Sequence, residues 1–241
     1  MKILALETSA KSVSAAVLAN GEVAAYAYQN TGLTHSRTLM PLVDGMLKNA
    51  GLAKEELNLI AVAAGPGSFT GLRIGVSAAK GLAWALDLPC CAVSTLEAMA
   101  RNLSCAEGTV VCAMDARRDQ VYNAVFTACG GALERCTPDR AIGLDQLAEE
   151  LRGRSAALYV VGDGAALCAA GLSQRGVPCV MAPAALRMQS AVGVALVAQE
   201  MAARGKTVSA AELTPNYLRL SQAERERLAR GLPLTADGSG R

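Results

Sequence analysis

The stretch that decides the fold reads Gly65-Pro66-Gly67-Ser68-Phe69-Thr70-Gly71-Leu72-Arg73-Ile74-Gly75. An apolar run at 59–64 precedes it and predicts a buried strand, and an Ala/Gly/Leu-rich stretch after it predicts a helix that ends near residue 86. The glycines and the proline suit a sharp turn, and the serine or the threonine can cap the helix that follows. The chain therefore contains a strand, a tight glycine turn and a long helix in immediate succession.

This arrangement presents backbone N–H groups to a phosphate in many proteins. The loop is not a Walker A loop, because Gly71 is followed by Leu72 rather than by lysine. The glycines at 65, 67 and 71 also miss the dinucleotide-binding spacing by one residue. Gly71 and Gly75, four residues apart, leave a small helix face that another backbone can approach closely. On these residues alone, a structural turn and an anion site both remain open.

Composition bounds the class of protein. The 241 residues are 52% hydrophobic and 18% charged, which permits one large domain or two lobes with a sizeable core. The formal net charge is +2, so there is no overall basic footprint of the kind that binds nucleic acid. A cluster of arginines at 225, 227 and 230 alternates with glutamates and favours a solvated helix face over the alternative, an RNA-binding patch.

The chain shows neither membrane nor metal signatures. No apolar run reaches 18 residues, and the N-terminus lacks the pattern of a signal peptide, so we expect a cytoplasmic protein without membrane contact. Eight cysteines are scattered without a C-x-x-C pair, and His35 is the single histidine. We therefore expect buried thiols in a reducing compartment and no metal site.

The order of predicted elements repeats in the two halves of the chain. Each half reads strand, hairpin, strand, helix, strand, and its first strand ends at an acidic residue, Glu7 or Asp115. This repetition predicts a duplicated α/β fold with two lobes, 1–104 and 105–222, and a partly disordered tail at 223–241. The predicted strands include 2–9, 12–18, 22–28, 59–64, 90–94, 110–114, 120–128 and 158–161, and the predicted helices are 36–50, 70–86, 95–103, 144–151, 165–173 and 188–204.

Six blocks of the sequence, in order, resemble the TsaB (YeaZ) family. They extend from residue 3 to about residue 222, and together they are specific, whereas any one alone would not be. The blocks are Ile3–Ser9, Thr34–Leu42, Gly65–Gly75, Val93–Met99, Met114–Tyr122 and Thr214–Arg219.

The resemblance implies a duplicated actin-like fold of the sugar-kinase and Hsp70 (ASKHA) type. It also implies a role in making threonylcarbamoyladenosine next to the anticodon of bacterial tRNA. In that pathway the metal-dependent paralogue TsaD transfers the threonylcarbamoyl group, and the small ATPase TsaE joins TsaB and TsaD. We therefore expect a non-catalytic scaffold for TsaD that meets tRNA only indirectly and needs no cofactor. The alternative is a nucleotide-dependent phosphotransferase or hydrolase of the same fold that acts alone.

The segment at 93–99 bears on catalysis. In the catalytic paralogue the comparable segment carries two metal-binding histidines one helical turn apart, and the matching positions here are Thr95 and Met99. A hydroxyl and a thioether are poor ligands for a hard or borderline divalent cation, and Glu97 cannot hold a metal alone. We expect neither a metal nor transferase chemistry.

Polar residues at strand ends mark a candidate cleft. In nucleotide-binding members of the superfamily such positions contact the nucleotide, which suggests weak or vestigial nucleotide binding at Ser9, Asp115, Gly162 and Asp163. The competing interpretation is that these are turn residues, with Asp115 paired to Arg117 or Arg118. The usual glycine turn after the first strand reads Ala10-Lys11-Ser12 here, which weakens the nucleotide hypothesis.

The helices 36–50 and 70–86 are the expected partner surface. By family resemblance they pack on the equivalent helices of TsaD, or in some members on a second TsaB, so a homodimer is also an expectation. The alternative is that their apolar side chains only fill the core. The candidates for an exposed interface stripe are Leu39, Met46, Arg73, Ala79, Leu82 and Leu86.

Overall fold

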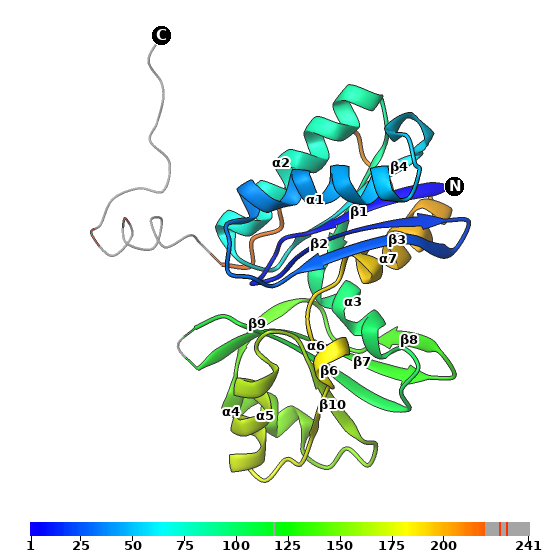
Figure 1. The fold of residues 1–241 in the computed structure, drawn as a ribbon. Helices are drawn as coiled ribbons and strands as arrows, with labels where there is room; N and C mark the ends of the chain where they lie inside the picture. Colours follow the sequence, from blue (N-terminus) through cyan, green and yellow to red (C-terminus); the bar gives the residue numbers. More distant parts are fainter. Residues whose placement is uncertain (118, 220–226, 228–229, 231–241) are drawn as a thin grey trace.

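The computed structural model of the protein describes residues 1–117, 119–219, 227 and 230. Within them the chain folds into two lobes, each built on one mixed β-sheet with helices packed against it (Figure 1). Of the expected tail at 223–241 the structure describes only Arg227 and Arg230, so the expectation for the tail stays a prediction. No helix in the described part of the chain is both long enough and apolar enough to cross a membrane.

Five strands form the sheet of the first lobe: β1 Lys2–Glu7, β2 Val13–Ala19, β3 Glu22–Gln29, β4 Leu59–Gly65 and β5 Cys90–Ser94. Their order is β3-β2-β1-β4-β5. Asn20 and Gly21 join β2 to β3 with φ angles of 52° and 89°, the positive values that a two-residue hairpin turn requires. β4 pairs parallel to β1, and β5 pairs parallel to β4.

Helices cover both faces of this sheet. On one face lie α1 His35–Asn49 and α2 Phe69–Leu86, and on the other lies α7 Ala191–Ala203 (Figure 1). Each face has its own apolar core. Because β1 is central and covered on both sides, its residues from Ile3 to Glu7 are all buried.

The second lobe repeats this plan. Its main sheet has the order β11-β10-β6-β7-β8. β6, β7 and β8 pair antiparallel, and β10 and β11 are added in parallel beside β6, so the expected duplication is confirmed. One further strand, β9, pairs with β7. The strands are β6 Gly108–Asp115, β7 Gln120–Cys129, β8 Ala132–Arg135, β9 Arg140–Gly143, β10 Leu158–Val161 and β11 Val180–Met181, and the packed helices are α4 Leu144–Leu151 and α5 Ala165–Gln174.

The end of the described chain returns to the first lobe. Helix α7 packs its apolar side chains on the first sheet, Val208 pairs with Cys90 of β5, and the Asn216 N–H donates to the Ala64 carbonyl at the end of β4. The expected division at residue 105 separates the two sheets. The expected boundary assigns residues 191–219 to the second lobe, whereas in the structure they pack with the first lobe.

Short elements link the lobes. They are α3 Thr95–Ala100, the 3₁₀ turn η2 Arg101–Leu103 and α6 Ala184–Arg187. A further 3₁₀ turn, η1 Lys54–Glu56, lies in the first lobe. The predicted helix 95–103 is thus an α-helix that tightens into a 3₁₀ turn. The predicted helix 188–204 begins later, at Ala191, because the Ser190 hydroxyl caps it by accepting from the Val192 N–H.

Candidate functional site

The glycine loop fits α2 tightly against neighbouring backbone. A Cβ on Gly71 would lie 2.1 Å from the Thr8 carbonyl oxygen, and one on Gly75 would lie 2.3 Å from the Thr8 hydroxyl. That hydroxyl donates to the Gly71 carbonyl at 2.7 Å. Ser68, rather than Thr70, is the N-cap, since its hydroxyl accepts from the Gly71 N–H. The loop therefore places the start of α2 directly against Thr8, the residue that follows β1.

The C-terminal strap, residues 216–219, packs across this loop. A Cβ on Gly65 would lie 2.2 Å from the Asn216 carbonyl oxygen, which shows how closely the strap passes. The Tyr217 ring packs on Phe69 with centroids 4.6 Å apart, and Arg73 donates to the Tyr217 hydroxyl at 3.2 Å. The Arg219 guanidinium donates to the Ala116 carbonyl of the second lobe. The strap therefore joins the first lobe to the second.

A cavity of about 580 Å³ lies between the lobes beside the strap. Three of the four predicted nucleotide-binding residues, Ser9, Asp115 and Asp163, line it together. Gly162 does not line it, because it packs against the second sheet, where a Cβ would lie 2.1 Å from the Ala113 carbonyl. The other polar or charged residues of the wall are Lys11, Ser68, Thr70, Arg117, Tyr122, Asn216, Tyr217 and Arg219.

The two aspartates of the cavity are held by local contacts. Asp115 accepts from the backbone N–H of Arg117 at 2.7 Å, which makes it a turn residue. Asp163 accepts from the Gln189 side-chain amide at 2.7 Å. Burial raises the pKa of Asp163, and the hydrogen bond from Gln189 lowers it in part. The cavity can offer hydroxyl groups and the cations of its wall to an anion, and nucleotide binding at these residues stays a prediction.

Glu7 lies buried at the end of β1. One carboxylate oxygen accepts from the Ser9 N–H, and the other has no hydrogen-bond partner in the structure. Burial raises the pKa of Glu7 from 4.5 to about 7, against the hydrogen bonds from Ser9, which lower it, while the nearby Asp163 adds a smaller rise. The Glu7 carboxyl therefore holds its proton far more tightly than an exposed glutamate does.

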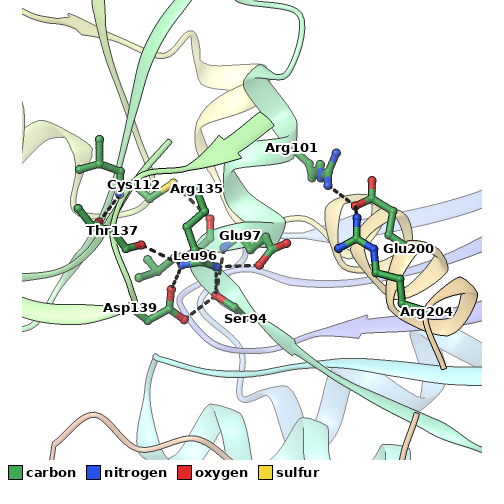
Figure 2. Close-up of polar contacts among 11 residues, drawn as sticks. Ser94, Leu96, Glu97, Arg101, Cys112, Arg135, Thr137, Asp139, Glu200 and Arg204 are labelled. Atoms are coloured by element: carbon green, nitrogen blue, oxygen red, sulfur yellow. Dashed lines mark hydrogen bonds and ion pairs between the residues drawn. The ribbon is translucent and has the colours of Figure 1, made fainter. Parts of the chain in front are cut away.

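The segment at 93–99 is part of a salt-bridge cluster between the lobes, shown in Figure 2. Arg135 of β8 lies between two carboxylates and donates to Glu97 at 2.7 Å and to Asp139 at 2.6 Å. The hydroxyl of Ser94 donates to the other oxygen of Asp139 at 2.6 Å and caps α3 by accepting from the Glu97 N–H. The Arg135 guanidinium also stacks over the Phe126 ring. The Glu97 carboxylate is thus engaged in an ion pair with Arg135.

The neighbouring side chains of α3 are packed in the core. Thr95 and Met99 are fully buried, and the Met99 sulfur lies against Gly162. Across the residues that the structure describes, no three His, Cys, Asp or Glu side chains gather in a way that could hold a metal ion. His35 contacts the Ala10 carbonyl at 2.7 Å, so it links the start of α1 to the loop after β1.

The predicted interface stripe is wrong for three of its six residues. Leu39, Met46 and Ala79 are buried in the core between the helices and the sheet, because they occupy the inward faces of α1 and α2. Leu82 and Leu86 are partly buried against the same core. Arg73 is exposed and bound to the strap. The interface role of Arg73, Leu82 and Leu86 stays a prediction.

The outward face of the helix pair carries a residue that the sequence analysis missed. Trp84, the single tryptophan, is 76% exposed on α2. It follows Arg73, Ser77 and Gly81 at helical spacing, so these residues share the outer face of α2. Met40 is exposed on α1. We call Met40, Ser77, Gly81 and Trp84 the helix-pair surface.

Comparisons with known proteins agree with this architecture. A family model described as TsaD, tRNA N6-adenosine threonylcarbamoyltransferase, matches residues 29–226. The chain is 36% identical to the tRNA threonylcarbamoyladenosine biosynthesis protein TsaB of Bacillus subtilis (strain 168), with 93% of this chain and 96% of that protein covered. The corresponding TsaB protein of Escherichia coli (strain K12) is 31% identical, with coverage of 91% and 95%.

A solved structure gives the same result. YeaZ from Pseudomonas aeruginosa superimposes with a TM-score of 0.78 at 30% identity, over 90% of this chain and 99% of that one. Together with the two equivalent sheets, this likeness confirms the duplicated actin-like fold. The chain belongs to the TsaB (YeaZ) family.

Proposed function

We propose that this chain is an accessory subunit that binds and supports TsaD in the threonylcarbamoylation of tRNA. Its family relatives carry the name of this pathway, and the matching family model is that of TsaD itself. The observation that carries the proposal is the helix-pair surface, where Trp84 is 76% exposed. A large aromatic side chain at such a position is typical of the centre of a protein–protein interface.

The proposal assigns no catalytic residue to the chain. Thr95 and Met99 are buried in the core, and both are weak ligands for a divalent cation. Glu97 is neutralised by Arg135, so its carboxylate serves the cluster between the lobes. In this proposal TsaD performs the transfer, TsaE joins the complex, and this chain meets tRNA only through its partners.

A substitution at the exposed tryptophan tests the proposal. Trp84→Glu places a charge on the helix-pair surface and should weaken TsaD binding at least about 30-fold, the cost of losing an interface hot spot. Leu167→Glu is the matched control, because Leu167 is exposed on α5 of the second lobe. Calorimetric titration with purified TsaD measures both variants, and circular dichroism checks that they fold.

The cellular readout is the level of the modified nucleoside after the chain is depleted. Complementation by the Leu167→Glu variant should restore the modification, and complementation by the Trp84→Glu variant should not. Equal TsaD affinity for both variants, or an intact modification level after depletion, would contradict the proposed function.

A second candidate function rests on the cavity between the lobes. Lys11, Ser68 and Thr70 line it near the N-terminus of α2, where an anion is favoured. A phosphotransferase or hydrolase acting alone would bind ATP and Mg²⁺ and turn over without TsaD. Calorimetric titration of the isolated chain with ATP and Mg²⁺, followed by a phosphate-release assay, separates the two. Tight binding with turnover would favour the enzyme.

A further inference from the structure

A second cavity of about 450 Å³, which we call the junction cavity, lies where the first lobe meets the segments that link it to the second. Its wall is built by β3 and α7 of the first lobe together with η2, α6 and residues 188–190. The volume falls within the range of about 300–1,000 Å³ that is typical of small-molecule sites, and such sites occur preferentially between domains. None of the residues predicted for the nucleotide site or the partner surface, all of which the structure describes, lines it.

Hydrogen bonds hold the elements of this wall together. The Tyr26 hydroxyl of β3 lies 3.3 Å from the hydroxyl of Ser190, which caps α7. The side-chain amide nitrogen of Asn102, in η2, donates to the carbonyl oxygen of Leu186 at 2.9 Å and to that of Met188 at 2.8 Å, and so holds α6 in place. The junction cavity is therefore formed by the fold itself, and a preformed site reduces the entropy that a ligand loses on binding.

Large apolar side chains form most of the wall. The rings of Tyr26 and Tyr28 have centroids 6.4 Å apart and are tilted by 39° to each other, and 44% and 40% of these residues is exposed. Leu186, Val192 and Leu196 contribute aliphatic side chains. Removing such apolar surface from water is favourable, and tilted rings of this kind accept a further ring in an offset or edge-to-face arrangement. The wall therefore favours an aromatic ligand.

The wall also carries polar groups that lack partners. Arg101 is the one charged residue of the wall among those that the structure describes, and its Nη2 donates to Glu200 at 2.7 Å (Figure 2). Its buried Nε and its Nη1 make no hydrogen bond within the described part of the chain. The side-chain oxygen of Asn102 and the hydroxyl of Tyr28 accept no hydrogen bond there either. Because Glu200 neutralises the guanidinium, the cavity favours a neutral ligand with a hydrogen-bond acceptor and donor over an anion.

We propose that the junction cavity binds a small, neutral aromatic molecule that carries an amide-type group. The ring of the ligand packs against Tyr26 and Tyr28, and its carbonyl oxygen accepts from the Arg101 guanidinium. An N–H of the same group donates to the side-chain oxygen of Asn102. A ligand of this class satisfies the polar groups without partners and covers the half-exposed rings at the same time.

The junction cavity lies on the α7 face of the first sheet, whereas the helix-pair surface lies on the α1 and α2 face. The proposed ligand therefore leaves Trp84 uncovered. Ligand binding and the proposed binding of TsaD rest on different residues, and either can fail without the other.

Methyl NMR of the full-length chain, with benzamide as the probe, tests the site. The methyl resonances of Leu186, Val192 and Leu196 should shift together as benzamide is added, with a dissociation constant of about 1 mM, which is usual for a ligand of this size. Acetamide lacks the ring and should give no shifts at the same concentrations. Benzoate brings a negative charge close to Glu200 and should bind less tightly than benzamide.

Two variants and a matched control locate the contacts. Tyr28→Ser removes one ring of the wall and should raise the dissociation constant for benzamide at least about fivefold. Arg101→Lys keeps a cation beside Glu200 but loses the guanidinium donors, and should raise it about threefold. Tyr217→Ser is the control, because Tyr217 is 39% exposed and lines the cavity between the lobes; this variant should leave the affinity unchanged. Circular dichroism checks that all three variants fold.

Each contrary result has a defined meaning. The absence of methyl shifts up to about 10 mM benzamide would overturn the proposal, as would an unchanged affinity in the Tyr28→Ser variant. Binding that Tyr217→Ser abolishes and Tyr28→Ser does not would place the ligand in the cavity between the lobes instead. Tighter binding of benzoate than of benzamide would overturn the assignment of a neutral ligand.

Discussion

Replacing Glu7 with glutamine isolates the energetic effect of one buried carboxyl. Glutamine keeps the length of the side chain and the oxygen that accepts from the Ser9 N–H. Its amide nitrogen takes the place of the second carboxylate oxygen, which has no partner in the structure. The substitution therefore removes the ionisable proton and little else.

The sign of the effect follows from the direction of the pKa change. The pKa of Glu7 rises from 4.5 to about 7 on folding, so the folded chain binds this proton more tightly than the unfolded chain. Stability then falls as pH rises from about 4.5 to about 7, and above that range the loss is complete. A pKa change of this size corresponds to about 3 kcal/mol. Glu7→Gln should therefore raise the free energy of unfolding by up to about 3 kcal/mol at pH 8.

Urea unfolding followed by circular dichroism at pH 4.5, 6 and 8 measures this difference. The gain should be less than about 1 kcal/mol at pH 4.5, because the folded carboxyl is then protonated and the unfolded one is about half protonated. Glu55→Gln is the control, since Glu55 is exposed on η1 and the same chemical change there meets solvent. A gain that is equal at all three pH values, or a loss of stability at pH 8, would refute the argument that the buried charge of Glu7 is uncompensated.

Two further predictions concern packing and ion pairs. Gly75→Ala should lower the free energy of unfolding by about 1–3 kcal/mol, because the new methyl group meets the Thr8 hydroxyl. Gly81→Ala in the same helix meets no atom within 4 Å, so it should raise the free energy of unfolding by up to about 1 kcal/mol in the same urea assay. Arg135→Met should cost about 2 kcal/mol in urea unfolding, because it leaves two carboxylates without their guanidinium. Arg152→Met, which breaks an exposed pair, should cost less than about 0.5 kcal/mol, and equal losses in the two arginine variants would contradict the structural role of the cluster.

Local chemistry made most of the secondary structure predictable. Asn20-Gly21 specifies a hairpin because both residues accept positive φ. The 3.6-residue period of apolar side chains located α1 and α2 to within one residue at each end. Each of these patterns lies within a short stretch of neighbouring residues, so a single sequence is enough to recognise it.

The face of each helix that meets the core was harder to predict. Leu39, Met46 and Ala79 belong to an apolar stripe, and a stripe of that width can serve a core or an interface. The structure places it in the core because Gly75 lets α2 pack closely on Thr8, just after β1, and on Val62 of β4. The exposed side of α2 is then the one that carries Trp84, which the spacing from Arg73 could have indicated.

Contacts between distant segments left no trace in the sequence pattern. Arg135 reaches Glu97 and Ser94 only because the β7–β8 hairpin brings it beside α3. Helix α7 is apolar around most of its circumference. This pattern indicates that the helix is buried, but it does not indicate which sheet the helix covers. Its return to the first lobe depends on the course of the chain after β11, and no local signal fixes that course.

The space around the glycine loop bears on the choice between a turn and an anion site. A phosphate needs N–H donors around it, whereas the space beside three of these glycines is filled by carbonyl oxygens. Positions for a Cβ on Gly65, Gly67 and Gly71 lie within 2.6 Å of the carbonyl oxygens of residues 216, 9 and 8, respectively. The Ser68 N–H is also taken, since it donates to the Ser9 carbonyl. Carbonyl dipoles repel an anion, so Gly65, Gly67 and Gly71 serve close packing of β1, α2 and the C-terminal strap, and an anion at the N-terminus of α2 would have to bind from the cavity side, where Ser68 and Thr70 lie.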